Sequence, residues 1–260
     1  MKIVDPKVYV LASTQLESGI VDYLVDNQIA WRPDHTVSGA ENLAEFAGRI
    51  CYRSWAKEDG TFENKNLSKV REGNELYISN IIKSKHGSVC EHGSVTFLLT
   101  DVTRVLTHEL VRHRVGTAYS QTSGRYVRCD DISIYIPEII KENDQATKVF
   151  TDITIEIENA IKELEKIYGI DSIPDFATKK LLTSAFRRIA PNGMTNDIVF
   201  TANHRTIRFV IQQRTANGAE IEIRIVFDAI ARLMKERFPN LYQDMNLNED
   251  GEWVFDCHKI

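Results

Sequence analysis

The sequence predicts an α+β protein in which long helices pack on a mostly antiparallel sheet, within a single domain spanning residues 1–260. Short β-branched segments are mixed with long amphipathic ones, without the strand–helix–strand rhythm of a parallel sheet. No internal repeat, linker or composition break marks a domain boundary. With 43% hydrophobic and 9% aromatic residues, the chain can bury one sizeable core.

Composition also narrows the class of protein. The aromatic content of 9%, with 43% hydrophobic residues, excludes a disordered chain, and the net charge of −5 argues against a basic nucleic-acid coat. No apolar run approaches the roughly 20 residues that span a bilayer, and an acid and a proline interrupt the start of the chain, where a secretory signal would be apolar. Four widely spaced cysteines without a CxxC pair are typical of reduced thiols in the cytoplasm.

The N-terminal elements follow from the spacing of apolar residues. Residues 7–13 alternate between apolar and polar side chains and predict a strand. Residues 41–52 have helical spacing, and the polar, glycine-containing stretch 56–75 predicts a surface loop. A second helix is expected over 76–86, with Gly87 as its C-terminal cap.

The middle of the chain predicts two strands around a short helix. Residues 94–102 are rich in β-branched and aromatic side chains, as in a strand. Thr103 is expected to cap a helix that runs to about Val111. Isoleucines alternate over 132–136, which predicts a strand that Pro137 ends.

The C-terminal half is expected to be mostly helical. Apolar residues at steps of three and four predict a long amphipathic helix over 144–168. Further helices are expected over 175–189, 203–214 and 219–238. Residues 246–260 show no clear period and are expected to be irregular.

The most unusual charge pattern lies in residues 104–128. Five arginines share this stretch with a single acid, Glu109, inside an acidic chain. Exposed ion pairs on a surface helix need no such excess of one sign, so the stretch predicts a binding site. The planar guanidinium binds phosphate with two parallel hydrogen bonds and stacks on flat rings. Glycines and hydroxyls between the arginines would let an anion approach the backbone.

A second acid-poor cluster occupies residues 203–214. Arg205 and Arg208 are three residues apart and are expected to share a helix face, while Arg214 points elsewhere. Together the two clusters predict a site for a polyanion. The glycines match neither GxGxxG nor GxxxxGK[ST], so side chains rather than backbone amides would hold it.

The segment HGSVCEH, residues 86–92, combines three residue types that bind zinc. However, Gly87 would interrupt a helix that aligned His86 with Cys90, and no fourth ligand follows at a zinc-site spacing. A ligand-facing turn without a metal is the preferred interpretation. Cys90, next to Val89, is expected to be a small core residue.

Four ordered motifs resemble those of the flavin-dependent thymidylate synthases, from about residue 40 to 240. They are HGSVCEH; RHR at 112–114 with SGRY at 123–126; FRRIAP at 186–191; and NHR at 203–205 through Arg214, with AEIEIR at 219–224. This resemblance implies a homotetramer that binds FAD, dUMP, methylenetetrahydrofolate and NADPH at subunit junctions. Its implied reaction is the reductive methylation of dUMP to dTMP, with the folate as carbon donor and FAD, reduced by NADPH, as hydride carrier.

The resemblance also assigns roles to residues. Contacts to FAD are implied for Ser88, Arg112, His113, Arg114, Asn203 and Arg205, with His86 close by. Contacts to dUMP are implied for Glu109, Arg112, Ser123, Gly124, Arg125, Arg187 and Arg214, with Gln121 near both ligands. Arg214 would be the catalytic residue, stabilising negative charge on the pyrimidine. The implied partners are small molecules, with no nucleic acid and no membrane.

The cysteines fit such a mechanism. A thiolate nucleophile needs a neighbouring cation to lower its pKa, and of the four cysteines only Cys129 stands directly beside an arginine, Arg128. Two aspartates follow Cys129 and oppose ionisation. Flavin chemistry requires no such nucleophile. Ser123 is more readily a hydrogen-bond donor to dUMP than a nucleophile, because the sequence places no base against it.

Four features depart from the family pattern. Glu109 stands where glutamine is frequent, and a carboxylate only accepts hydrogen bonds unless it is protonated. Phe209 and Gly218 stand where many relatives have a polar, flavin-contacting side chain such as histidine, which predicts that flavin is held more weakly or by other groups. Eight residues rather than the commoner seven separate Arg114 from Ser123.

Two other classes of function remain open from the residues alone. Arginines interleaved with Tyr119 and Tyr126 would suit a single-stranded nucleic-acid-binding module without catalysis. His86, Cys90 and His92 would centre a metal-dependent hydrolase.

Overall fold

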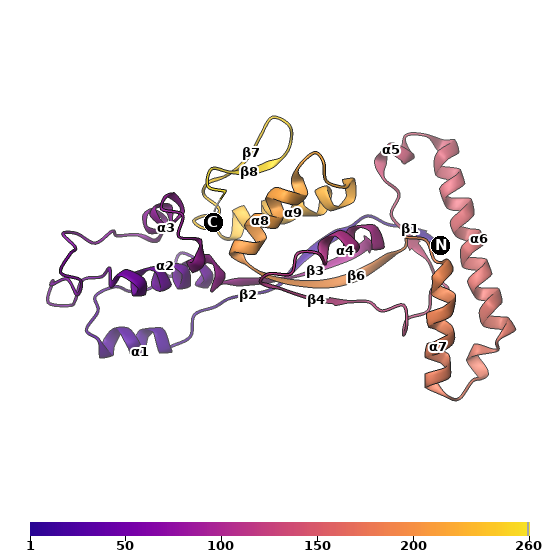
Figure 1. Ribbon diagram of the computed structural model, residues 1–260, viewed down its shortest axis with the longest axis horizontal. Helices are drawn as coiled ribbons and strands as arrows, with labels where there is room; N and C mark the ends of the chain where they lie inside the picture. The colour runs from indigo at the N-terminus through magenta and orange to yellow at the C-terminus, as the bar shows by residue number, and fades with distance from the viewer. Residues whose placement is uncertain (259) are drawn as a thin grey trace.

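An antiparallel four-stranded sheet forms the centre of the molecule in the computed structural model, which describes residues 1–258 and 260. Its strands lie in the order β2–β3–β6–β4. They are β2 (Lys7–Ser13), β3 (Ser94–Thr103), β4 (Thr117–Gln121) and β6 (Thr195–Asn203). Helices gather at both ends of this sheet and over one face (Figure 1). The predicted α+β class, with a mostly antiparallel sheet packed by long helices, is confirmed.

The two central strands alternate between a buried and a half-buried face. Phe97 of β3 and Phe200 of β6 are cross-strand partners, fully buried, with ring centroids 6.0 Å apart. On the opposite face, the hydroxyls of Thr96 and Thr201 lie 2.9 Å apart. Burial of the aromatic pair therefore fixes the register of the strands that carry the site.

Three helices cover the buried face of the sheet, and two of them begin directly at strand ends. They are α4 (Arg104–Leu110), α8 (His204–Thr215) and α9 (Ile221–Arg237). Thr103 caps α4 by accepting from the Leu106 amide, as predicted, and Asn203 caps α8 by accepting from the Thr206 amide. Because β3 and β6 are antiparallel, α4 and α8 start at opposite ends of the sheet and run toward each other.

At one end of the sheet lie four short elements with a small core of their own. They are α1 (Gly19–Asp26), α2 (Gly39–Tyr52), α3 (Asn74–Lys83) and the 3₁₀ turn η1 (Gly87–Glu91). Leu24, Ile29 and Trp55 form the apolar centre of this region. Ser38 and Glu41 make a reciprocal capping box at the start of α2.

The opposite end carries the long helix α6 and its neighbours (Figure 1). These elements are β1 (Lys2–Ile3), β5 (Ser133–Ile134), α5 (Glu138–Lys141), α6 (Asp144–Ile167), η2 (Ile170–Ser172), α7 (Phe176–Phe186) and η3 (Arg187–Ile189). β1 pairs with β5 in parallel, and Ile132, Ile134 and Ile161 centre a second apolar cluster.

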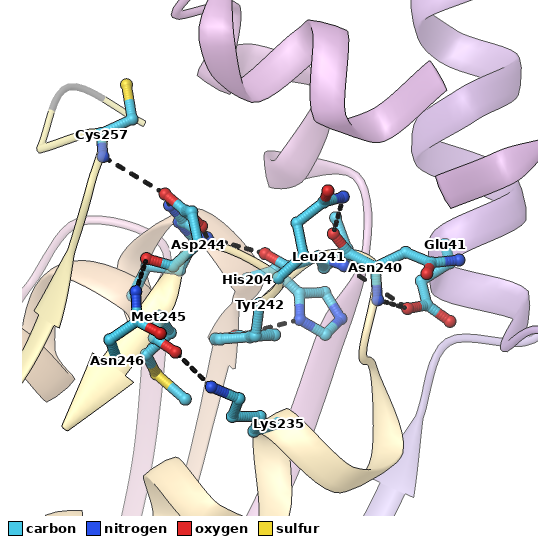
Figure 2. Close-up of polar contacts among 12 residues, drawn as sticks. Glu41, His204, Lys235, Asn240, Leu241, Tyr242, Asp244, Met245, Asn246 and Cys257 are labelled. Atoms are coloured by element: carbon cyan, nitrogen blue, oxygen red, sulfur yellow. Dashed lines mark hydrogen bonds and ion pairs between the residues drawn. The ribbon is translucent and has the colours of Figure 1, made fainter. Parts of the chain in front are cut away.

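A hairpin of β7 (Met245–Leu247) and β8 (Trp253–Phe255) packs on α8 and is tied to it by a buried ion pair. Arg208 of α8 makes two hydrogen bonds with the Asp244 carboxylate, at 2.7 and 2.8 Å. Both side chains are buried. The Asp244 carboxylate also accepts a hydrogen bond from the Cys257 amide (Figure 2).

The bounds predicted for one helix and one strand are wrong. α3 ends at Lys83, and the left-handed backbone position that follows it falls on Lys85, with a φ of +60°, so Gly87 begins η1 rather than capping α3. The strand predicted over 132–136 shortens to β5, because the Ile132 amide donates to the Glu158 carboxylate rather than to a strand.

Residues 246–260 are not irregular, since they complete the hairpin, although Lys259 lies outside the described residues. Six elements carried no prediction: α1, α5, β1, β4, β6 and η2. No helix in the described part of the chain combines the length and apolar character needed to cross a membrane.

Asp244→Ala is expected to lower the free energy of unfolding by about 3–5 kcal/mol, because it leaves the Arg208 guanidinium buried without its partner. Urea unfolding followed by circular dichroism measures the change. Asp152→Ala, which breaks an exposed pair with Lys148, is the control and should cost less than about 1 kcal/mol. Equal losses in the two variants would contradict the structural role given to Asp244.

Candidate active site

The junction of α4 and α8 is organised around Arg214. Its Nε donates to His113 Nε2 at 2.9 Å, and its Nη1 donates to Glu109 Oε2 at 2.5 Å. Its Nη2 donates to the backbone carbonyl of Glu109 at 3.1 Å. These three hydrogen bonds fix the guanidinium, whose side chain is 18% exposed. A partly desolvated, immobile cation can stabilise negative charge on a bound ligand without reorganising.

His113 is a neutral member of this junction. Burial, and then the nearby Arg214 cation, lower the pKa of His113 to about 4. The ring therefore accepts from Arg214 through Nε2 and carries its proton on Nδ1 at neutral pH. Its edge faces Phe209, with ring centroids 6.0 Å apart.

A cavity of about 660 Å³ opens beside His113. It is lined by Glu91, Arg112, His113, Arg114, Val115, Asn203, Arg205, Thr206, Phe209, His258 and Ile260. Arg112 and Arg114 form no ion pair with any described residue, whereas Arg205 pairs with Glu91. Exposed guanidiniums beside apolar side chains suit a ligand that combines phosphates with flat rings, as a flavin dinucleotide does.

The turn after RHR is held against the start of α8 by a glycine. Gly116 has a φ of +66°, and a Cβ there would lie 2.3 Å from the Asn203 side-chain nitrogen. The Gly116 carbonyl instead accepts from the Asn203 amide at 3.2 Å. Thr206 adds a hydrogen bond to the Val115 carbonyl at 2.8 Å. This close approach brings the two arginine-rich segments to one cavity.

A second group of cations lies near the loop that follows β4. The Arg187 side chain packs on Gly124, where a Cβ would lie 3.2 Å from Arg187 Cδ. Burial, and then the charge of Arg187, lower the pKa of Arg104. Arg125 lines a separate cavity of about 420 Å³ together with Lys180 and Arg188.

The sequence profile of the family described as "thymidylate synthase complementing protein" matches residues 34–240. The chain belongs to this family. A family member from Mycobacterium phage D29, named probable flavin-dependent thymidylate synthase, is 36% identical over 247 residues, which cover 92% of this chain and 96% of the relative. The flavin-dependent thymidylate synthase of Mycobacteroides abscessus is 32% identical over 249 residues, covering 95% and 92%.

A solved structure shares the fold. The UMP/dUMP methylase PolB from Streptomyces cacaoi, crystallised with 5-Br dUMP, superposes with a TM-score of 0.62 at 17% identity, covering 94% of this chain and 96% of that one. The resemblance inferred from the four motifs is therefore confirmed. Because the chain belongs to this family, it is an enzyme of the flavin-dependent thymidylate synthase class rather than a nucleic-acid-binding module.

Within this family member, most residues that the resemblance assigns to flavin meet in one place. Those that line the 660 Å³ cavity are Arg112, His113, Arg114, Asn203 and Arg205. His86 and Ser88 lie exposed at η1 outside the lining, and His86 stacks on Tyr52 with centroids 5.7 Å apart. Gln121 donates to the Thr107 hydroxyl at 3.0 Å and to Asn196.

The residues assigned to dUMP fall into two sets. Glu109 and Arg214 belong to the junction, and Arg112 lines the adjoining cavity. The second set lies on the loop after β4 and on η3, outside that lining; it consists of Ser123, Gly124, Arg125 and Arg187.

Arg208 does not share a face with Arg205, contrary to the prediction. Arg205 reaches the cavity, whereas Arg208 turns into the core toward Asp244 because that carboxylate offers two acceptors there. Two lining residues, Glu91 and Thr206, sit inside motifs that the sequence singled out. His258 and Ile260 come from the segment expected to be irregular, and no sequence signal pointed to them.

The free energy of unfolding is expected to fall as pH drops from about 6.5 to 4. An unfolded histidine titrates near 6.5, whereas His113 in the fold titrates at about 4, so the unfolded chain binds this proton first. His113→Asn should flatten the fall by about 1–2 kcal/mol, less than the full shift because the ring is partly exposed. Urea unfolding at several pH values measures it, and identical profiles would contradict the neutral ring.

Proposed function

We propose that the enzyme reductively methylates dUMP to dTMP, with methylenetetrahydrofolate as carbon donor and FAD, reduced by NADPH, as hydride carrier. The observation that carries this proposal is the position of Arg214, fixed by Glu109 and His113 beside an arginine-lined cavity. The names of the relatives, and the 5-Br dUMP bound to the structural neighbour, support the same ligands.

Arg214 is the proposed catalytic residue. Because His113 is neutral at physiological pH, the fixed positive charge at the junction resides on Arg214. This cation would stabilise the negative charge that the pyrimidine ring acquires as its carbon accepts the one-carbon unit. The bound flavin supplies the hydride, and the protein supplies position and charge.

In this proposal the cavity beside the junction holds FAD. Arg112, Arg114 and Arg205 would bind its phosphates, and Asn203 and His113 would contact it near the junction. We place Gln121, His86 and Ser88 near the cofactor because the family resemblance assigns them there. NADPH would reduce this flavin.

The cationic group near β4 would hold the nucleotide phosphate. Arg187 and Arg125 offer charge there, Ser123 offers a hydroxyl, and Gly124 lets the chain approach closely. Glu109 would accept from the nucleotide, because a carboxylate that already binds Arg214 keeps free lone pairs.

The cysteines give independent support to flavin rather than thiolate chemistry. Burial raises the pKa of Cys90 to about 11 and also raises the pKa of Cys129, despite nearby arginines. Both thiols therefore stay protonated near neutral pH and are poor nucleophiles. The four cysteines are free, which fits the reducing cytoplasm.

We also propose that the single domain of residues 1–260 assembles as a homotetramer. Apolar side chains lie exposed on the helices of one end of the molecule, among them Val149 and Ile153 of α6 and Phe176 and Leu181 of α7. The residues assigned to dUMP line more than one cavity of the chain. Association of four copies would cover these apolar faces and bring the separate sets of residues assigned to dUMP together at the subunit junctions.

The direct test is spectroscopic and kinetic. Purified protein should show the visible absorption of flavin, and added dUMP should accelerate NADPH oxidation in the presence of the folate, with dTMP as product. Failure to bind FAD, or oxidation without dTMP, would overturn the proposal.

Arg214→Ala is expected to lower dTMP formation by roughly 10–150-fold while FAD stays bound, because one charge-assisted hydrogen bond contributes about 1.5–3 kcal/mol. Product chromatography and the flavin spectrum measure the two effects. Glu109→Ala/Arg214→Ala controls for the carboxylate that the single variant leaves unpaired. Wild-type turnover by Arg214→Ala would contradict its role.

Arg114→Ala should release flavin, because it removes an unpaired guanidinium from the cavity lining. Dialysis followed by the visible spectrum reports the FAD that remains. Arg237→Ala, an equal loss of charge at an exposed position in the last turn of α9, should retain FAD. Retention of FAD by both variants would remove Arg114 from the cofactor site.

A further inference from the structure

The chain segment after β8 forms part of the wall of the 660 Å³ cavity. His258 and Ile260 line it together with residues of α8 and of the RHR segment. Both lie beyond residues 34–240, the part of the chain that the family profile matches. This part of the cavity wall therefore comes from residues outside the region that the chain shares with the family profile.

Two contacts on one side hold the segment in place. The amide of Asp256 donates to the Asp244 carbonyl at 3.1 Å. The amide of Cys257 donates to the Asp244 carboxylate at 3.3 Å (Figure 2). Asp244 is itself fixed by the buried Arg208. The position of the segment thus depends on the ion pair that ties the hairpin to α8.

On the other side, Ile260 is buried against η1. A Cβ at Gly87 would lie 2.8 Å from the Ile260 Cα, and Ile260 itself is only 6% exposed. Gly87 belongs to the HGSVCEH motif. The segment therefore connects the hairpin anchor to a motif assigned to the cofactor site, and His258 lies between these two anchors.

The His258 ring is oriented by α8. Its Nδ1 lies 2.9 Å from the Gln212 side-chain amide nitrogen. Since that nitrogen can only donate, Nδ1 accepts and Nε2 carries the proton in this tautomer. No described residue accepts from Nε2, and the ring lines the cavity, so a polar donor is available to a ligand there.

Phe209, another residue of the lining, offers no such donor. It is 54% exposed and presents an apolar ring to the cavity.

We propose that His258 is a cofactor-binding residue that donates a hydrogen bond from Nε2 to the flavin cofactor, in a cavity where Phe209 offers only an apolar ring. This inference rests on the proposed function, because it takes FAD as the ligand of the cavity. It concerns binding of the cofactor and makes no change to the reaction.

Titration of the flavin-free protein with FAD, followed by flavin fluorescence, tests the assignment. His258→Ala should weaken FAD binding by about 2–12-fold, the range for one hydrogen bond. His258→Gln keeps an N–H donor on a side chain of similar reach and should recover most of the affinity. His35→Ala, an exposed histidine outside this cavity, is the matched control and should bind as the wild type does.

Thermal unfolding of the flavin-free variants separates an effect on binding from an effect on folding. All three variants should have the same unfolding midpoint temperature as the wild type. A wild-type affinity in His258→Ala, or an equal loss in His35→Ala, would overturn the role of His258. If the wild type binds FAD and forms dTMP while His258→Ala is unaffected, only this inference fails. If the wild type binds no FAD, the proposed function fails first.

Discussion

A buried guanidinium is stable only when a carboxylate or carbonyl meets it, and this constraint sorts the arginines of the protein. Arg208 and Arg49 are buried, each paired with a buried carboxylate, and they hold the fold together. Arg112, Arg114 and Arg187 form no ion pair with any described residue. In an acidic chain that could supply partners, Arg112 and Arg114 stay unpaired in the lining of a cavity, which is the basis for proposing that they bind an anionic ligand.

Arg214 stands between these two classes. It is half-buried and is held by Glu109 and His113, and His113 in turn lines the cavity. The strands explain how this happens, because antiparallel pairing of β3 and β6 starts α4 and α8 from opposite ends of the sheet. Their facing turns then bring together residues about a hundred positions apart. In the proposed function, the preorganised charge at this junction is what the protein contributes to catalysis, while the bound flavin supplies the redox chemistry.

The hairpin connects the structural and the functional arginines. Asp244 neutralises Arg208 in the core and also accepts from the Cys257 amide, which leads to the cavity wall. One carboxylate thus stabilises the packing of β7 and β8 and positions the segment that carries His258. Folding stability and the shape of the cavity proposed for the cofactor are therefore coupled through a single side chain.

The sequence by itself determined the fold class, the long helices over 144–168, 203–214 and 219–238, and the family, because apolar period and ordered motifs are local properties of a chain. It also indicated the RHR and NHR segments as parts of one site, and the structure brings five of the residues assigned to flavin to one cavity.

Only the tertiary structure decided which arginines are structural. Arg205 and Arg208 look equivalent in sequence, and they differ because one faces a cavity and the other meets Asp244, 36 positions away. It also decided that residues 246–260 form a hairpin and a cavity wall. Such contacts depend on partners distant in the chain, whose positions no local pattern encodes.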